Sequence, residues 1–321
     1  MTTSATETST GFVHPALFYR SDRDYLDGLI PFITEGLALG QPVAVAVPAA
    51  KLRLLRHALG AAADDVTLID MEQAGRNPGR IIPTVLRRFA DDHADTHVRI
   101  VGEPIWAGRS ELEYPACAQH EALINLAFAG RDVTIVCPYD LSALDQRAVD
   151  DALLTHPVVW EGTRSYESDR YAPEAIVSRY NEPLDDLSGA ADAAVLPISS
   201  SVRSRDARKF AGEHAERLGL GADRIADLQL IATELVANSI RHTDGDGELR
   251  IWRDGNQLVC EVRDSGRLTD PLVGKIPAEP GQLNGRGLLL VNQLADLVRT
   301  HTTDHGTAVY AFVALDTAPR N

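Results

Sequence analysis

The first half of the chain alternates short, continuous apolar runs with longer stretches of helical character. The predicted strands are 42–48, 66–70, 97–103 and 133–138, and the predicted helices are 49–60, 78–92 and 114–128. Strands that are separated by helices of this length predict a parallel, doubly wound α/β sheet. Continuous apolar runs such as Pro42–Pro48 are typical of strands that are covered on both faces.

The second half follows a different order, with two helices before the first long strand. Residues 201–218 and 223–242 are predicted helices, and strands are predicted at 257–263, 298–303 and 307–315. The second helix has apolar positions at 3.6-residue spacing, namely Ile225, Leu228, Ala232, Leu235, Ser239 and Ile240. The segment 267–284 is rich in Pro and Gly, which predicts a long loop, and loops of this length are usually either functional lids or disordered.

Three polar side chains recur every four residues on the helix 223–242. Glu234, Asn238 and His242 therefore lie about one turn apart on one face. Mg²⁺ takes oxygen ligands from few protein groups together with phosphates, and Asn238 offers an amide oxygen. Glu234 is placed to act as a general base on a hydroxyl or water, which makes it the candidate catalytic residue. The alternative is that all three side chains only face solvent.

A second candidate motif stands where the strand 257–263 ends. Asp264 can accept the exocyclic amino group of adenine, and Gly266 lets the base approach the backbone. Thr307, which follows a glycine in the turn before the last strand, can contribute a hydroxyl at the same end of the base. The alternative for Asp264 is an ordinary Asx turn.

A third motif opens the helix that follows the long loop. Gly285, Arg286 and Gly287 precede Leu288 and a run of apolar residues. A glycine-rich helix start can bind phosphate through its outward-pointing amides, and Arg286 can add positive charge.

In this order, the motifs of residues 197–315 resemble the GHKL ATPases, the superfamily of gyrase, Hsp90, histidine kinases and MutL. The resemblance implies an α/β-sandwich domain with the Bergerat fold, which binds ATP and Mg²⁺. It implies Asn238 as the Mg²⁺ ligand and the following binding residues: Asn238, His242, Asp264, Gly266, Gly285, Arg286, Gly287, Leu288 and Thr307.

Within this superfamily, the run from Pro197 is most similar to the anti-sigma-factor branch of serine-protein kinases. That similarity implies that Glu234 activates a Ser or Thr hydroxyl of an anti-sigma antagonist, and that the domain also binds a sigma factor. Arg267-Leu-Thr departs from that branch, which usually has Gly and Pro there. A non-catalytic module that only binds ATP and a partner is the alternative. A sensor histidine kinase is disfavoured, because no two-helix hairpin with an acceptor His precedes the domain and His214 lies within it.

The first half resembles the MEDS sensory domain of bacterial signalling proteins. The resemblance rests on residues 14–19 (HPALFY), residues 31–37 (PFITEGL) and Cys137-Pro-Tyr-Asp140, and it implies the sensing of an unknown small ligand or partner. The strand 43–47 has the place of a RecA-like core strand, but no Gly-Lys-Ser/Thr phosphate loop follows it, and Lys51 stands alone. The expected fold is therefore RecA-like without a P-loop.

Two small residue groups in this half invite a binding interpretation. His14, Tyr19, Glu103 and Tyr139 are expected near strand ends, where doubly wound sheets bind ligands, although a satisfied polar cluster is the alternative. Cys117 and His120 have helical i, i+3 spacing, but no second Cys or His pair stands nearby to complete a metal site.

Composition and boundaries complete the sequence-based prediction. The expected parts are a disordered tail at 1–13, a sensory domain at 14–180, a linker at 181–196 and an ATPase domain at 197–321. The net charge of −15 excludes duplex nucleic acid as an expected direct partner. Neither a long apolar span nor a signal peptide is evident, so we expect a cytoplasmic protein without membrane contact. Relatives of the ATPase domain suggest a homodimer.

Overall fold

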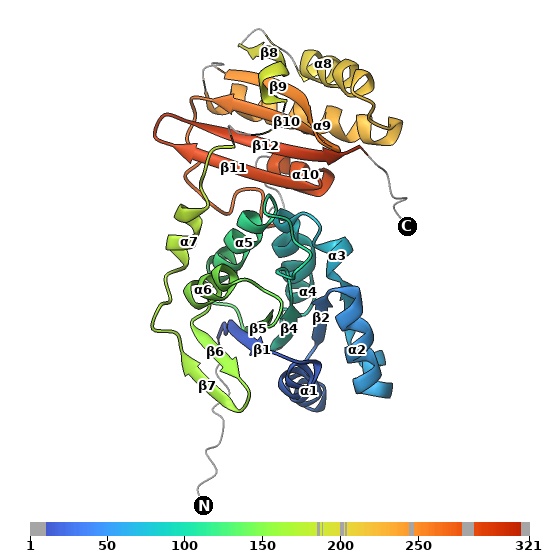
Figure 1. The fold of residues 1–321 in the computed structure, drawn as a ribbon, viewed down its shortest axis with the longest axis vertical. Helices are drawn as coiled ribbons and strands as arrows, with labels where there is room; N and C mark the ends of the chain where they lie inside the picture. The colour runs from blue at the N-terminus through green and yellow to red at the C-terminus, as the bar shows by residue number, and fades with distance from the viewer. Residues whose placement is uncertain are drawn as a thin grey trace, which may run out of the picture. The chain divides into compact units, whose positions relative to one another are not determined.

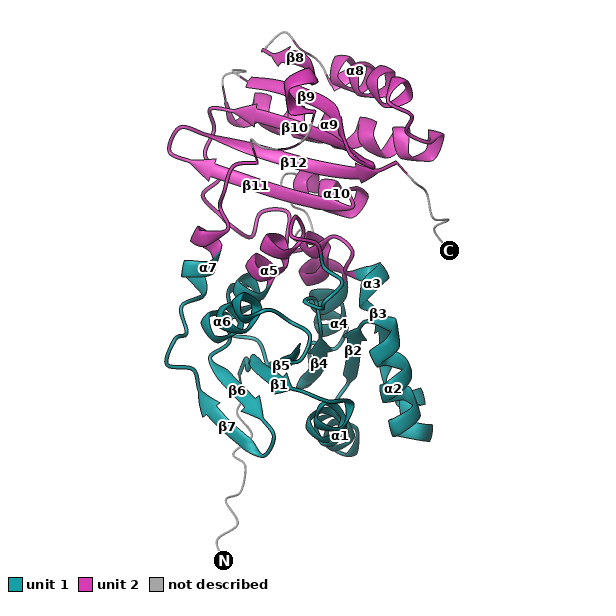
Figure 2. Cartoon of the chain, in the orientation of Figure 1, with its two compact units in different colours: residues 1–74, 85–109, 121–176 teal, residues 75–84, 110–120, 177–321 magenta. Residues whose placement is uncertain are grey.

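The structure is a computed structural model, which describes residues 11–184, 187, 189–199, 202, 204–243, 247–277 and 286–315. The first ten residues of the predicted tail and the predicted phosphate-binding Gly285 lie outside the described residues. The chain divides into two compact units, which Figure 2 colours separately. Unit 1 comprises residues 1–74, 85–109 and 121–176, and unit 2 comprises residues 75–84, 110–120 and 177–321.

The first half of the chain alternates strands and helices as the apolar pattern predicts (Figure 1). Its strands are β1 (Pro15–Tyr19), β2 (Val43–Val47), β3 (Thr67–Asp70), β4 (Val98–Gly102), β5 (Val133–Asp140), β6 (Val158–Glu161) and β7 (Arg164–Glu167). Its helices are α1 (Asp22–Ala38), α2 (Ala49–Leu59), α3 (Met71–Ala74), α4 (Arg87–Asp92), α5 (Tyr114–Ala127), α6 (Gln146–Thr155) and α7 (Pro173–Arg179). Short turns of other helix types are η1 (Gly60–Asp65), η2 (Pro78–Arg80) and the π-helical η3 (Ile82–Leu86).

These strands form one sheet in the order β3-β2-β4-β5-β1-β6-β7. Every neighbouring pair is parallel except β6 with β7. All five residues of β1 and all five of β2 are buried, as expected for strands that are covered on both faces. The predicted parallel-dominated α/β fold is confirmed.

Two local predictions in this half need correction. The expected helix 78–92 is helical throughout, but it is not one α-helix, because it changes from the 3₁₀ turn η2 to the π-helical η3 and then to α4. Pro83 lies inside this segment and lacks the N–H that an α-helical hydrogen bond needs, which explains the π-helical turn around it. The expected tail also ends earlier than residue 13, because Val13 forms a β-bridge with Thr134 and its N–H donates to the carbonyl of Val133 at 3.0 Å.

The second half forms an antiparallel sheet in the order β11-β12-β10-β9-β8. The strands are β8 (Ala194–Ile198), β9 (Gly247–Asp254), β10 (Gln257–Asp264), β11 (Leu297–Thr303) and β12 (Gly306–Ala314). The helices are α8 (Ser204–Arg217), α9 (Ala222–His242) and α10 (Arg286–Leu294), with a short 3₁₀ turn η4 (Ala190–Asp192) before β8. The helices share one core with the sheet, which confirms the predicted α/β sandwich.

The core of unit 2 forms along the predicted apolar stripe of α9. Leu228, Ala232 and Leu235 are buried, and Ile225 and Ile240 pack against the same core with partial exposure. Two strands differ from the prediction. β8 begins at residue 194, inside the expected linker 181–196, and β9 was not predicted, because charged residues interrupt its apolar positions. None of the helices among the described residues is both long and apolar enough to cross a bilayer.

Candidate nucleotide site

A cavity of about 350 Å³ opens in unit 2 where four segments of the predicted motifs meet. The C-terminal half of α9, the turn after β10, the start of α10 and the start of β12 all contribute to its wall. The lining residues are Leu235, Asn238, Arg241, His242, Val262, Asp264, Gly266, Arg267, Leu268, Thr269, Asp270, Val273, Gly287, Leu288, Thr307 and Val309.

Helix α9 brings two of the predicted residues against the start of α10. A Cβ atom added to Gly287 would lie 2.8 Å from Glu234 Oε2 and 3.1 Å from Asn238 Nδ2. Any larger residue at position 287 would therefore press on both side chains. A carboxylate and an amide oxygen meet here beside the first turn of a helix, and both side chains are only partly buried.

The turn after β10 is held by a small hydrogen-bond network. The N–H of Gly266 donates to Asp264 Oδ1 at 2.9 Å, and Thr307 Oγ1 donates to the carbonyl of Gly266 at 2.8 Å. Thr302 Oγ1 lies 2.8 Å from Thr307 Oγ1. The N–H of Leu268 donates to Thr302 Oγ1 at 3.2 Å. Asp264, Gly266, Leu268 and Thr307 all line the cavity, so this network shapes its wall.

Two of the predicted site residues do not line the cavity. Arg286 is exposed and is not among the residues that line the cavity. Glu234 is not among them either, although its carboxylate lies close to Gly287, which is. His242 is exposed at the end of α9 but lines the cavity. The structure thus brings Asn238, His242, Asp264, Gly266, Gly287, Leu288 and Thr307 around one space.

Sequence reasoning missed two polar residues at this site. Arg241 donates from Nη1 to Asn238 Oδ1 at 3.4 Å, so a cation stands beside the proposed metal ligand. Its i, i+3 spacing from Asn238 was the available signal. Thr302 was missed because nothing in the strand 298–303 separates it from the neighbouring threonines.

The polar residues that the sequence places at strand ends of the first half form two separate groups. Tyr19 and Tyr25 donate their hydroxyls to Glu103 at 3.3 and 3.2 Å, and the Lys51 ammonium lies over both rings. Burial raises the pKa of the Glu103 carboxyl to about 8, although Lys51 and the two hydroxyls oppose this shift. Tyr19 and Glu103 therefore belong together, as expected.

His14 and Tyr139 belong to the other group. Their rings both lie next to that of His156, at centroid distances of 4.1 Å for His14 and 5.5 Å for Tyr139. Among the described residues, the group that is suited to a metal ion contains neither Cys117 nor His120.

Two domain families match the chain. The family described as the MEthanogen/methylotroph, DcmR Sensory domain (MEDS) matches residues 13–157, and the histidine kinase-like ATPase domain matches residues 199–312. The chain joins a MEDS domain to a histidine kinase-like ATPase domain. The ATPase domain is of the GHKL type that the motifs predict, and its match encloses the cavity residues. No curated protein sequence matches the chain.

Two solved structures show weak similarity. The RsbU and RsbW domains of a Mycobacterium tuberculosis protein share 18% identity over 40% of this chain and 34% of theirs, with a TM-score of 0.31. The Acinetobacter baumannii histidine kinase AdeS shares 11% identity over 64% of this chain and 98% of its own, with a TM-score of 0.23. The chain spans about a third of the first structure, and these scores are too low to support an argument about function.

Proposed function

We propose that the ATPase domain binds Mg·ATP in the cavity and transfers a phosphoryl group to a Ser or Thr of a partner protein. The observation that carries this proposal is the approach of Glu234 and Asn238 to Gly287, at the wall of a cavity of about 350 Å³. That volume lies in the range of small-ligand sites, about 300–1,000 Å³. Asp264 and Thr307 would then hold the adenine, and the start of α10 would face the phosphates.

The residues present are suited to Mg²⁺. Asn238 offers one amide oxygen, and few protein ligands are needed where phosphates and water supply the others. A bound Mg²⁺ would neutralise charge on the phosphate oxygens. Arg241, which now contacts Asn238 Oδ1, would be free to turn toward the phosphates once that oxygen has another partner.

Glu234 has the role of general base in this proposal. Its carboxylate accepts the proton of a Ser or Thr hydroxyl while that oxygen bonds to the γ-phosphorus and the bond to the ADP oxygen breaks. A serine or threonine acceptor is favoured over histidine by the elements before the domain. Among the described residues from 158 to 199, the one α-helix is α7, which has seven residues and no His. His214 lies in α8, which packs on α9 inside the domain.

The biological role that we propose follows the anti-sigma resemblance of α8 and α9. The substrate would be an anti-sigma antagonist, and a sigma factor would be the second partner, under control of the MEDS domain. Cytoplasmic location and homodimer formation stay predictions of the sequence.

A non-catalytic binding module is the second candidate. It is favoured by one observation, that Glu234 lies outside the described lining of the cavity. In this alternative the domain binds ATP and a partner without transferring phosphate.

Two substitutions separate the candidates. Glu234→Gln should reduce transfer to an antagonist about a hundredfold or more while leaving ATP affinity nearly intact, because a general base typically contributes that much. Asn238→Ala should weaken Mg²⁺-dependent ATP binding about tenfold or more, because it removes a ligand to a charged group. Calorimetry measures binding, and labelled ATP with acid-stable phosphate on the antagonist measures transfer.

The matched controls are Glu216→Gln and Asn256→Ala, whose residues are exposed elsewhere in unit 2. Transfer by Glu234→Gln at the parental rate would rule out the base. Binding without any transfer would favour the binding module, and acid-labile phosphate on the chain itself would indicate a histidine kinase. Absence of ATP binding would overturn the proposal at its first step.

A further inference from the structure

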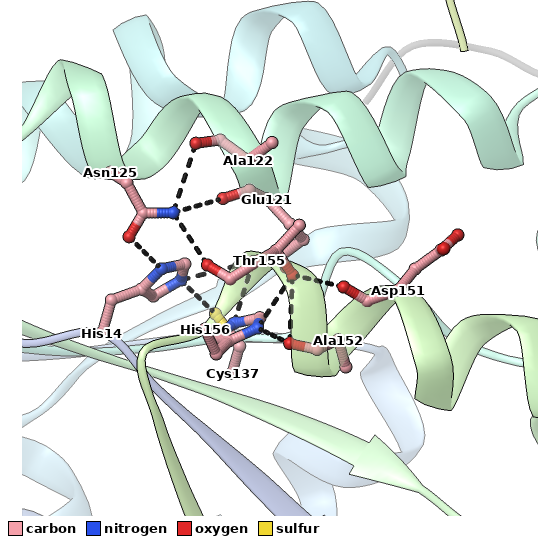
Figure 3. Close-up of polar contacts among 9 residues, drawn as sticks. All are labelled: His14, Glu121, Ala122, Asn125, Cys137, Asp151, Ala152, Thr155 and His156. Carbon is pink, nitrogen blue, oxygen red and sulfur yellow. Dashed lines mark hydrogen bonds and ion pairs between the residues drawn. The ribbon is translucent and has the colours of Figure 1, made fainter. Parts of the chain in front are cut away.

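Four buried side chains converge inside the MEDS domain, far from the nucleotide cavity in the sequence. They are His14, Glu121, Cys137 and His156, and their nitrogen, oxygen and sulfur atoms all lie within 4.8 Å of one another. His14 precedes β1, Glu121 is on α5, Cys137 is on β5 and His156 follows α6. All four residues are fully buried, with 0% exposure. Figure 3 shows these side chains and the polar contacts around them.

The hydrogen bonds behind the two histidines determine which ring nitrogen points inward. Asn125 directs its Nδ2 at the carbonyl oxygens of Thr155 and Ala122, at 2.8 and 3.2 Å, so its Oδ1 must face His14 Nδ1 at 3.1 Å. His14 Nδ1 is therefore a donor. His156 Nδ1 lies 3.0 Å from the carbonyl oxygen of Ala152, so it is a donor as well. In each neutral ring, Nε2 then carries a lone pair.

Both of these lone pairs lie close to the carboxylate of Glu121. Nε2 of His14 and Nε2 of His156 each lie 3.3 Å from Glu121 Oε2. Among the described residues, neither carboxylate oxygen of Glu121 nor Nε2 of His156 has a hydrogen bond of acceptable geometry. Acceptors that face one another in a dry interior are destabilising unless a cation or a proton lies between them.

Adding protons to these side chains does not relieve the contact between the lone pairs and the carboxylate. Protonating both rings would place two imidazolium cations with centroids 4.1 Å apart in the protein interior. A thiol proton on Cys137 could bond to His14 Nε2, 3.3 Å from the sulfur, but it would leave His156 facing the carboxylate. A divalent cation satisfies all four ligands at once. With two neutral imidazoles, a thiolate and a carboxylate, the group and the ion would together be uncharged.

The distances also fit a tetrahedral ion. Ligand atoms held about 2.0–2.3 Å from a zinc ion lie about 3.3–3.7 Å from one another. Three of the pairs, namely His14–Glu121, His156–Glu121 and His14–Cys137, are separated by 3.3 Å. A set of two imidazoles, one thiolate and one carboxylate favours Zn²⁺ or a similar transition metal over Mg²⁺ or Ca²⁺.

We propose that His14, Glu121, Cys137 and His156 form a binding site for a divalent transition metal of the zinc class. Asn125 and the carbonyl of Ala152 act as its outer shell, because they orient the two rings. Four protein ligands leave no open position, so the site holds the ion rather than activating a water molecule on it. The proposal is independent of ATP binding in the other domain.

Cobalt substitution of the full-length chain tests the site. The chain is stripped with a chelator, and Co²⁺ or Zn²⁺ is added back. We expect one equivalent per chain and a thiolate-to-cobalt charge-transfer band in the near ultraviolet. Cys137→Ser should abolish that band and reduce the metal-induced rise in unfolding temperature. Glu121→Gln should weaken metal binding without removing the band.

The three cysteines of the chain provide the controls. Cys117 and Cys260 are equally buried but lie outside the group, so the double variant Cys117→Ser/Cys260→Ser should keep the full band. Cys137 is the one cysteine that remains in this double variant, so a band there must come from Cys137 even if Cys137→Ser does not fold. Failure to take up one equivalent of either ion, or a band that persists without Cys137, would overturn the proposal. The group would then be a metal-free hydrogen-bond network.

Discussion

At the scale of single residues, the two buried glutamates of the MEDS domain have opposite surroundings. Glu103 is 2% exposed and receives hydrogen bonds from two tyrosine hydroxyls, whereas the Glu121 carboxylate faces two imidazole nitrogens. The surroundings of Glu103 suit a neutral carboxylic acid, or a carboxylate that accepts hydrogen bonds from two donors. Those of Glu121 suit a carboxylate only when a cation is present.

The raised pKa of Glu103 predicts a pH-dependent stability. The folded chain keeps the Glu103 proton up to about pH 8, whereas the unfolded chain releases it near 4.5. Its contribution to folding is therefore complete at acid pH and is lost as the pH rises between these two values, by roughly 1.4 kcal/mol per unit. The free energy of unfolding of the MEDS domain should thus fall over this range.

Denaturation of the full chain at several pH values measures the effect. Glu103→Gln should flatten the profile, because an amide cannot release a proton. Glu167→Gln, at an exposed position of β7, should leave the profile unchanged. A wild-type profile that is already flat over this range would contradict a raised pKa at Glu103.

At the scale of elements, the start of α10 lies close to α9 at the candidate nucleotide site. Gly287→Ala places a methyl group 2.8 Å from the end of the Glu234 side chain. That flexible side chain can turn away at small cost, and Ala is favourable in a helix. We therefore expect phosphoryl transfer to fall about tenfold or more, since misplaced catalytic groups are costly, while the unfolding temperature stays within a degree or two.

Transfer assays and thermal unfolding of the same preparation check this prediction. Gly11→Ala is the control, because an added Cβ there meets nothing within 4 Å. Unchanged transfer by Gly287→Ala would show that the approach of α10 to Glu234 does not matter for the reaction.

Elements with strong periodicity were predicted well. Helix 223–242 is observed as Ala222–His242, and the strand 257–263 as Gln257–Asp264. The segment 78–92 is helical as predicted, but a proline within it changes the hydrogen-bond pattern to a π-helical one, which periodicity does not record. β9 was missed because its stability comes from pairing with β8 and β10 rather than from its own composition.

At the scale of the whole molecule, charge predicts which partners the chain avoids. A net charge of −15 repels the phosphate backbone, so we expect no binding to duplex DNA at about 0.15 M salt. Fluorescence anisotropy with a labelled duplex measures this directly. Binding that weakens steeply as salt increases would reveal a local basic surface that the net charge conceals.

The sequence by itself determined that two different domains follow one another, the fold class of each, and most of the residues that line the candidate nucleotide cavity. It could do so because the ATPase residues stand in short motifs whose helical spacing and turns already determine their local geometry. It predicted Glu234 as the catalytic residue, with a solvated side chain as the alternative, and in the structure this residue is not among those that line the cavity.

Only the tertiary structure brought His14, Glu121, Cys137 and His156 together. These residues come from four separate segments of the chain, and no spacing in the sequence connects them. Sheet pairing brings β1 beside β5, with Ala16 opposite Cys137, and helix packing places the Glu121 carboxylate beside both imidazoles. Local periodicity records which face of an element is buried, but the partners that meet there are decided by the topology of the sheet.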